Sequence, residues 1–261
     1  MTKTILVTGA TDGIGLLTAQ LLAEQGHTVL LHGRSQDKLE RAQASLVGAC
    51  QIYKADLSSL SETRDLAEAI RAEHSVLDVL INNAGVFKTP NPKLPSGQDV
   101  RFVVNTVAPY VLTKALLPIL PPEGRVINLS SAAQAPVNLG AMRGEVSVAD
   151  MDAYAMSKLA ITIWSQEMAK QWADGPVVIA VNPGSLLASK MVKEGFGVAG
   201  HDLRIGADIL CKLALDPAHG RDSGKYWDND AGRFAPPQSA ASDPAHVAQV
   251  MDALEHLAQP A

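Results

Sequence analysis

The chain has 261 residues, of which 47% are hydrophobic and 19% are charged, and its formal net charge is −5 at pH 7. This length suits one α/β domain whose core is large enough to need no disulfide or metal crosslink. Lys and Arg form no run along the sequence, so we expect neither nucleic acid nor an anionic membrane surface as a partner.

The cysteines, histidines and apolar segments indicate the compartment. Cys50 and Cys211 are far apart and fit no disulfide framework or metal motif, which favours a reducing environment. No stretch approaches 18 consecutive apolar residues, and the segment at Met1 lacks the apolar core of a signal peptide. The seven histidines are scattered without metal-ligand spacing. The sequence therefore predicts a cytoplasmic protein with no membrane span and no metal.

Apolar, β-rich runs alternate with stretches of helical period along the chain. Strands are predicted at 4–8, 28–32, 51–54, 76–82, 125–130, 177–182 and 225–228, and helices at 14–25, 36–46, 60–73, 97–116, 151–173, 203–215 and 244–258. The strands are mostly continuous apolar runs, which is typical of a parallel sheet buried on both faces. We predict an α/β fold: a single doubly wound Rossmann domain over 1–261, with a seven-stranded, mainly parallel sheet flanked by helices.

Three loops stand out by their composition. The stretch 86–97 holds three prolines and 195–202 holds three glycines. Both follow strands, so we expect them at the carboxyl edge of the sheet, where ligands bind in such folds. The stretch 232–244 reads as a surface connection before the last helix.

The first loop, from Thr8 to Gly15, follows a strand and opens a helix. Gly9 permits a tight turn, Gly13 lets the backbone approach a pyrophosphate, and Gly15 allows close helix–sheet contact. Backbone N–H groups and the helix dipole then favour an anion. The sequence predicts that the loop binds a dinucleotide; the alternative is a plain connecting turn. The predicted cofactor contacts here are Gly9, Thr11, Asp12, Gly13, Ile14 and Gly15.

The pattern Thr-Gly-x-x-x-Gly-x-Gly of this loop resembles the short-chain dehydrogenase/reductase family. Further motifs of that family follow in order over residues 4–190: Asn82-Asn-Ala-Gly85, Asn105, Ser130-Ser131, Tyr154-Ala-Met-Ser-Lys158 and Asn182-Pro-Gly184. The stretches AYAMSKLAITIWSQEMAK and SGKYWDND look most like the retinol-dehydrogenase-like branch. The resemblance implies hydride exchange between a nicotinamide and a carbonyl or alcohol.

Tyr154 and Lys158 lie four residues apart, so a helix places them on one face. An ammonium and a positive nicotinamide stabilise the phenolate and lower the tyrosine pKa, which suits Tyr154 for acid–base work. The resemblance implies that Lys158 also holds the nicotinamide ribose, that Ser131 binds the substrate oxygen, and that Asn105 binds a water linked to Lys158. Ser130 is the alternative candidate for the serine that binds the substrate oxygen. The alternative role for Ser131 itself is that of a helix cap or turn residue.

The same spacing recurs at Tyr110 and Lys114. No strand ending in Ser precedes this second copy. We therefore interpret Tyr110 as a helix residue that packs or faces solvent.

Cofactor preference depends on the end of the second strand. Gly33 stands where NAD-selective relatives place an acid, and Arg34 follows it. A guanidinium can hold a 2′-phosphate by paired charge-assisted bonds, so we predict NADP(H) in preference to NAD(H). The alternative is a solvated Arg at the start of the next helix, and Asp12 adds no second positive charge.

The resemblance assigns the remaining cofactor contacts. It places Asp56 and Leu57 at the adenine, Asn83, Ala84 and Gly85 at the adenine ribose, and Tyr154, Lys158, Pro183 and Gly184 among the other contacts. Asp56 also suits the N-cap of the following helix, and the two roles are compatible.

Two departures from the family pattern concern the substrate side. Ser131 and Tyr154 are 23 positions apart, a longer spacing than usual, so we expect the insertion 136–150 to arch over the active site. Ala188 stands where the family often has Thr or Ser for the carboxamide, and Ser189 beside it is a candidate replacement. The apolar segment 186–202 is predicted as a substrate loop or lid, with a packing helix as the alternative.

The sequence thus predicts an NADP(H)-dependent oxidoreductase for a small, hydrophobic carbonyl or alcohol substrate. The alternative is a non-catalytic NADP(H)-binding sensor or scaffold. A nucleotide-sugar epimerase or dehydratase is a third interpretation, which the short segment after Gly184 disfavours. Homodimers or homotetramers are common in the family, and the sequence indicates no interface.

Overall fold

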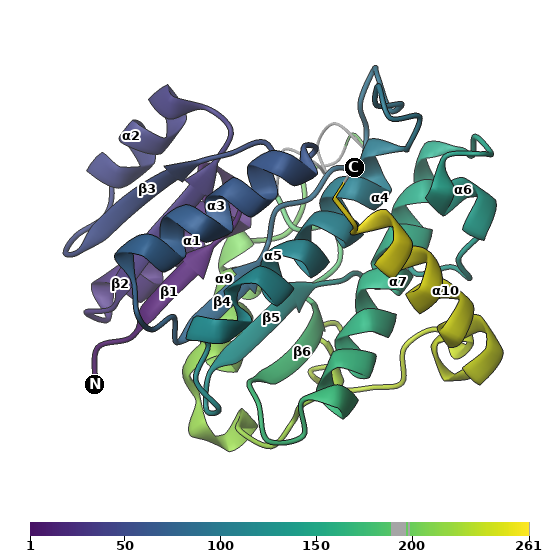
Figure 1. The fold of residues 1–261 in the computed structure, drawn as a ribbon. Coiled ribbons are helices and arrows are strands. Elements are labelled where there is room, and N and C mark those ends of the chain that lie inside the picture. Colours follow the sequence, from purple (N-terminus) through teal and green to yellow (C-terminus); the bar gives the residue numbers. More distant parts are fainter. Residues whose placement is uncertain (189–196, 198, 261) are drawn as a thin grey trace.

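The computed structural model describes every residue except 189–196, 198 and 261. In this part of the chain, eight strands form one sheet in the order β3-β2-β1-β4-β5-β6-β7-β8 (Figure 1). All neighbouring strands are parallel except β7 and β8. The predicted doubly wound α/β fold is confirmed, with one short antiparallel strand more than expected. The strand order changes direction between β1 and β4, which is where such sheets bind ligands.

The strands are apolar and well covered. Their bounds are β1 (Thr4–Val7), β2 (Thr28–Gly33), β3 (Cys50–Lys54), β4 (Val79–Asn82), β5 (Arg125–Leu129), β6 (Val177–Asn182), β7 (Tyr226–Asp228) and β8 (Arg233–Phe234). Every residue of β4, β5 and β6 is buried, as expected for strands with helices on both faces. Strand β4 begins three residues later than predicted, and the Leu77 amide donates to the carbonyl of Ile119 instead.

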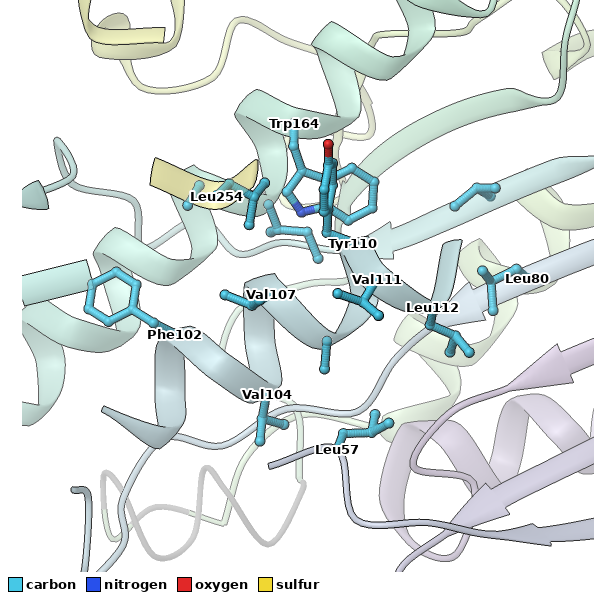
Figure 2. Packing of buried hydrophobic residues seen from close by; sticks show 14 of the residues in the cluster. Leu57, Leu80, Phe102, Val104, Val107, Tyr110, Val111, Leu112, Trp164 and Leu254 are labelled. Carbon is cyan, nitrogen blue, oxygen red and sulfur yellow. The ribbon is translucent and has the colours of Figure 1, made fainter. Parts of the chain in front are cut away.

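Two helical layers cover the sheet. One contains α1 (Gly13–Glu24), α2 (Gln36–Ala44) and α9 (Leu203–Leu215); the other contains α3 (Leu60–Glu73), α5 (Ala108–Leu116), α7 (Asp150–Gln171) and α10 (Pro244–Leu257). Alternate residues of a strand point into opposite layers. In β1, Leu6 packs against the layer that contains α5 and α7, and Ile5 and Val7 pack against the layer that contains α1 and α9. In the second layer, Tyr110, Trp164 and Leu254 bring α5, α7 and α10 together (Figure 2).

The helix predicted over 97–116 begins at Val100 and is built from three pieces: α4 (Val100–Phe102), the π-helical segment η1 (Val103–Val107) and α5. The 3₁₀ turn η2 (Leu117–Ile119) follows directly. The whole run Val100–Ile119 is apolar and long enough to cross a membrane by composition, but 72% of its most apolar window is buried inside the protein. Its contacts with α3 and α7 are those of a core helix.

Two stretches contain structure that the sequence did not predict. The insertion 136–150 includes α6 (Leu139–Arg143), which packs against α10, and the Val137 amide donates to His246 of α10. None of the residues 136–149 lines the cleft described below. The connection 232–244 includes β8 and the 3₁₀ turn η4 (Ser239–Ser242), and a third such turn, η3 (Pro217–His219), follows α9.

Candidate active site

A cleft of about 570 Å³ opens at the carboxyl edge of the parallel strands. It runs from the end of β2, past the glycine loop, to the start of the segment after β6. The structure brings all predicted site residues except Asn105 to its lining: Gly9, Thr11, Asp12, Gly13, Ile14, Gly15, Arg34, Asp56, Leu57, Asn83, Ala84, Gly85, Ser131, Tyr154, Lys158, Pro183 and Gly184.

The glycine loop needs its glycines for two different reasons. Gly9 and Gly13 have φ of 65° and 56°, a backbone conformation that other residues rarely adopt. A Cβ on Gly15 would lie 2.3 Å from Nδ2 of Asn83 and 2.4 Å from the carbonyl oxygen of Gly9. Gly15 therefore leaves room for a neighbouring loop, whereas the sequence analysis assigned it to helix–sheet contact in general. Asp12 caps α1 by accepting from the Gly13 amide at 2.7 Å.

Thr8 and Asn83 join the glycine loop to the turn after β4. The Thr8 hydroxyl accepts from the amides of Asn83 and Ala84, both at 3.0 Å, and the Asn83 side chain donates to the carbonyl of Thr8 at 2.8 Å. These bonds fix the start of the glycine loop, and the first turn of α1 that follows it lines the cleft. Backbone amides at a helix N-terminus lack partners inside the helix and suit a phosphate group.

His32 was missed by the sequence analysis, although it lines the same cleft. It is 2% exposed, and burial lowers its pKa to about 4, so the ring is neutral at pH 7. Its Nδ1 accepts from the Gly9 amide at 3.3 Å and its Nε2 lies 3.1 Å from the carbonyl of Ala55. A neutral ring with the proton on Nε2 satisfies both bonds. His32 thus links the glycine loop to the end of β3.

Two cations stand at the β2 end of the cleft. Arg34 and Lys38 are both exposed and line it; Arg34 follows β2, and Lys38 lies in the first turn of α2. Lys38 is the second positive charge that the sequence analysis did not find at Asp12. A Cβ on Gly33 would lie 2.6 Å from the methyl group of Thr11, so this position leaves little space for an acidic side chain.

Asp56 lines the cleft but does not cap α3. The N-cap is Ser59, whose hydroxyl accepts from the Glu62 amide at 3.2 Å. Asp56 accepts from the Ser58 amide at 2.9 Å within the preceding turn. The predicted N-cap role of Asp56 is therefore wrong, because α3 starts three residues later than that role requires.

Tyr154 and Lys158 project from α7 toward the end of β5. The Lys158 Nζ lies 5.6 Å from the centre of the Tyr154 ring and donates to the carbonyl of Leu129 at 2.6 Å. Lys158 is 4% exposed, and burial lowers its pKa to about 8. Burial raises the pKa of Tyr154, while a hydrogen bond with Ser131 acts to lower it. The net direction in the structure is a rise, opposite to the lowering predicted from the charges of Lys158 and the nicotinamide.

The two serines after β5 have different surroundings. Ser130 is buried, donates to the carbonyl of Lys158 at 2.9 Å and lies 2.7 Å from the hydroxyl of Thr162. Ser131 is partly exposed, and its hydroxyl accepts from the Ala133 amide at 3.1 Å, which is the turn role considered above. Both serines line the cleft, Ser131 is the more exposed of the two, and Ser130 fastens β5 to α7.

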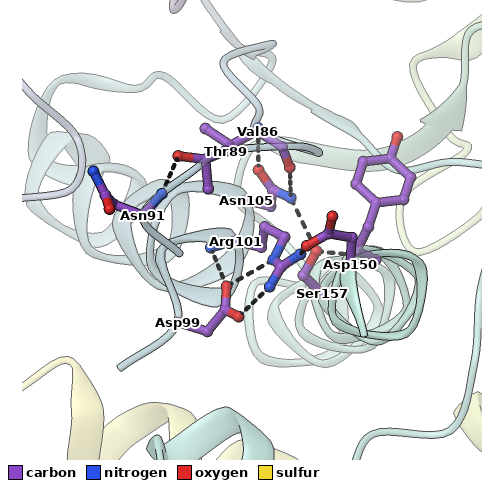
Figure 3. Close-up of polar contacts among 9 residues, drawn as sticks. Val86, Thr89, Asn91, Asp99, Arg101, Asn105, Asp150 and Ser157 are labelled. Atoms are coloured by element: carbon purple, nitrogen blue, oxygen red, sulfur yellow. Dashed lines mark hydrogen bonds and ion pairs between the residues drawn. The ribbon is translucent and has the colours of Figure 1, made fainter. Parts of the chain in front are cut away.

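Asn105 lies in the π-helical segment η1 and is fully buried. Its Oδ1 accepts from the Val86 amide at 2.8 Å, and its Nδ2 donates to the Val86 carbonyl at 2.9 Å and to the Ser157 hydroxyl at 3.0 Å (Figure 3). The side chain therefore fixes the loop after β4 against α7. A water-mediated link to Lys158 stays a prediction.

The second Tyr-x-x-x-Lys pair lies away from the cleft. Tyr110 is 2% exposed, packs against Trp164 with ring centroids 5.7 Å apart, and bonds to Glu255 of α10. Lys114 bonds to the same carboxylate at 3.1 Å. This pair fastens α10 to α5.

The turn after β6 carries the predicted Pro183 and Gly184, with φ of 127° at Gly184. Beyond it, the amide of Ala188 donates to the carbonyl of His201 and the amide of His201 to that of Leu186, both at 2.7 Å. The two ends of the segment 186–202 are thus tied together. Ser189 and most of the predicted lid lie outside the described residues.

These features fit a nicotinamide dinucleotide. The glycine loop and the N-terminus of α1 suit its pyrophosphate, and a Tyr/Lys/Ser group lies further along the same cleft. Among the described residues, no cluster of three or more His, Cys, Asp or Glu side chains is placed to hold a metal ion.

The fold and the site define a dehydrogenase or reductase of the Rossmann class. The chain belongs to the short chain dehydrogenase family, whose model matches residues 3–196. Human retinol dehydrogenase 13 is 34% identical over 200 residues, which are 70% of this chain and 58% of the human protein. The resemblance to the family and to retinol dehydrogenases is confirmed.

Solved structures share the fold. An uncharacterized protein from Mycobacterium paratuberculosis superposes with a TM-score of 0.82 at 28% identity, covering 98% of this chain and 93% of that one. Pseudomonas aeruginosa RhlG in an active-site complex with NADP superposes with a TM-score of 0.70 at 27% identity, covering 88% and 95%.

Proposed function

We propose that the protein is an NADP(H)-dependent oxidoreductase that exchanges a hydride between the nicotinamide and a carbonyl or alcohol of a small hydrophobic substrate, with Tyr154 as the general acid and base. The observation that carries this proposal is the meeting of Ser131, Tyr154 and the buried Lys158 at one cleft, with the Lys158 Nζ 5.6 Å from the centre of the Tyr154 ring. The three groups line the same cleft as the glycine loop.

Each residue has a separate task in this mechanism. The bound cofactor supplies or accepts the hydride. Tyr154 gives its proton to the carbonyl oxygen during reduction and takes it back from the alcohol during oxidation. Ser131 donates a hydrogen bond to the same oxygen, and the Lys158 ammonium stabilises the phenolate once the proton has left.

Arg34 and Lys38 support the preference for NADP(H). Two cations that line the same end of the cleft suit a 2′-phosphate, whereas an acidic acceptor suits a ribose hydroxyl and Gly33 offers none. The NADP bound to Pseudomonas RhlG is consistent with this preference.

The substrate end of the cleft supports a hydrophobic substrate. Val86, Phe87, Val100 and Val104 line it on the side of α4, and the Phe87 ring lies 5.1 Å from that of Tyr154. Apolar side chains with few polar groups favour a hydrophobic or aromatic carbonyl compound. The similarity to a retinol dehydrogenase points the same way.

The test combines cofactor titration with a turnover screen. NADPH and NADH are titrated separately, and NADPH oxidation is then followed with ketones, aldehydes, quinones and retinoids. We expect tighter NADPH binding, turnover of at least one hydrophobic carbonyl, and loss of turnover in Tyr154→Phe with cofactor binding kept. Tyr110→Phe is the matched control, because Tyr110 also stands four residues before a Lys.

Two results would overturn this function. NADPH binding without turnover of any carbonyl favours the sensor or scaffold instead. Undiminished turnover in Tyr154→Phe excludes Tyr154 as the acid and base.

A further inference from the structure

The motif Tyr226-Trp-Asp-Asn-Asp230 forms β7 and the turn that follows it, at the edge of the active site. The sequence analysis noted this stretch only as a family likeness. Its side chains bond to the backbone after β5 and to the backbone after β6. Those two segments carry Ser131 and the turn Pro183–Gly184.

Ser131 lies beyond the last bond that its strand makes with β6. Strand β5 ends at Leu129, and the Ser130 amide still donates to the carbonyl of Val181 at 2.8 Å. The Ser131 carbonyl instead accepts from the Tyr226 hydroxyl at 3.0 Å and from Nε2 of Gln134 at 2.9 Å. Tyr226 is 5% exposed, so a rigid, buried phenol fixes the backbone of Ser131.

The turn after β6 is held by the other end of the motif. The Asp230 carboxylate accepts from the Ser185 amide at 2.8 Å, from the Ser185 hydroxyl at 2.5 Å and from the Asn182 side chain at 2.9 Å. The Asn229 side chain donates to the carbonyl of Pro183 at 2.9 Å. Every residue from Asn182 to Ser185 thus bonds to this motif directly or through Asn182, whose Oδ1 accepts from the Gly184 amide at 3.2 Å.

The ionised state of Asp230 is part of this arrangement. Burial acts to raise its pKa, but the bonds from Ser185 and Asn182 hold that pKa below its ordinary value. A carboxylate only accepts hydrogen bonds and can serve all three donors, whereas an amide in its place presents two N–H groups to other donors.

We propose that Tyr226 and Asp230 are positioning residues of the catalytic centre. Tyr226 sets the place of Ser131 on the proton-transfer side, and Asp230 sets the turn Pro183–Ser185 on the nicotinamide side. The inference rests on the proposed function. Both residues come from one short strand, β7, and the turn that follows it. A single element therefore aligns the groups for proton transfer and those on the nicotinamide side.

The test compares Tyr226→Phe and Asp230→Asn with two matched controls. Tyr53→Phe also removes one buried phenol hydroxyl, which in this case bonds to Glu73 outside the cleft. Asp222→Asn removes a carboxylate that bonds to Lys225 and His219 away from the cleft. Thermal unfolding and circular dichroism establish that each variant is folded before its kinetics are read.

For Tyr226→Phe we expect kcat to fall about 3–10-fold, the value of one hydrogen bond, with NADPH affinity within about twofold of the wild type. Without the Tyr226 bond the Ser131 side chain shifts and no longer lowers the pKa of Tyr154. The descending limb of the pH profile for reduction therefore moves to higher pH. Ser131→Ala shows the direction of that shift. For Asp230→Asn we expect the NADPH dissociation constant to rise about 3–10-fold, with a larger rise in Asp230→Ala.

The inference is overturned if both variants match their controls in kcat, NADPH affinity and pH profile. It is also overturned if activity per folded molecule is unchanged while only thermal stability falls. An inactive wild-type protein overturns the proposed function and the role of Tyr226 with it. The NADPH affinity of Asp230→Asn still decides whether Asp230 positions the turn.

Discussion

The guanidinium of Arg101 bonds to Asp150, the first residue of the helix that carries Tyr154 and Lys158 (Figure 3). Arg101 is 1% exposed and also holds both carboxylate oxygens of Asp99, the N-cap of α4, at 2.8 and 2.5 Å. One buried cation therefore joins the N-termini of the two helices on either side of the substrate end of the cleft. Acidic residues at these positions also complement the helix dipoles.

Replacing Arg101 with Met is expected to lower the free energy of unfolding by about 1–3 kcal/mol, because it leaves two carboxylates without their shared partner. The loss stays below that of a fully buried pair, since Asp150 is 45% exposed and can be hydrated. Urea unfolding measures it. Arg204→Met is the control, because its ion pair with Asp208 is exposed and is worth less than about 1 kcal/mol. Equal effects of the two substitutions would contradict the structural role of Arg101.

Ser130 and Ser131 are expected to separate stability from catalysis. Ser131→Ala should lower kcat/KM about 100-fold, as removal of a donor to a developing oxyanion does. It should cost about 0.5–1 kcal/mol of stability, because the Ala133 amide loses its partner. Ser130→Ala should cost about 1–2 kcal/mol of stability, because it removes bonds to the Lys158 carbonyl and to Thr162. Steady-state kinetics and urea unfolding of both variants measure the two effects. A larger loss of kcat/KM in Ser130→Ala would show that Ser130, and not Ser131, acts in catalysis.

Arg34 and Lys38 are expected to act on NADPH and hardly on NADH. Each Ala substitution should weaken NADPH binding about 10-fold or more, since a charge-assisted bond contributes about 1.5–3 kcal/mol. NADH affinity should change by less than about twofold. Fluorescence titration at two salt concentrations checks this, because the contribution of exposed cations weakens as salt rises. Lys212→Ala, far from the cleft lining, is the control. Parallel losses for both cofactors would show that the two cations do not read the 2′-phosphate.

Lys158 predicts a pH dependence of stability. Burial lowers its pKa from 10.5 to about 8, so between these values the unfolded chain binds more protons than the folded one. Stability attributable to this group therefore rises as pH increases from about 8 to 10.5, and below pH 8 the buried charge costs its full penalty. Lys158→Met removes this dependence. Urea unfolding of both proteins from pH 6 to 10 should show the variant gaining most, relative to the wild type, at the lower pH values. A difference that stays constant with pH would contradict the shift.

The sequence was most informative about features that depend on residues close together in the chain. The glycine loop is recognisable because positive φ at Gly9 and Gly13 and close approach at Gly15 leave few other residues possible. Tyr154 and Lys158 were predicted together because helical spacing alone places them on one face. The strands were found because burial on both faces makes them continuously apolar, and only a strand as short as β8 carries too few residues to show a pattern.

The contacts that the sequence did not reveal are made by residues far apart in the chain. Tyr226 reaches Ser131 across 95 positions, and nothing near either residue signals the bond. His32 reads as an ordinary strand residue because its partners, Gly9 and Ala55, come from other loops. From the sequence, Lys38 is an ordinary exposed helix residue; only the structure shows that it lines the cleft. Such roles depend on tertiary packing, which sequence periodicity does not report.

The π-helical segment η1 makes the site sensitive to residue number as well as to residue type. A π turn contains one residue more than an α turn, so Val103–Val107 is equivalent to a single-residue insertion in a regular helix. Deleting one residue here would restore α-helical winding and rotate everything before it by about 100° relative to α5. Asn105 would then leave both Val86 and Ser157, although no chemical group of the site had been altered. Homologous chains that lack this extra residue must fasten the loop after β4 in another way.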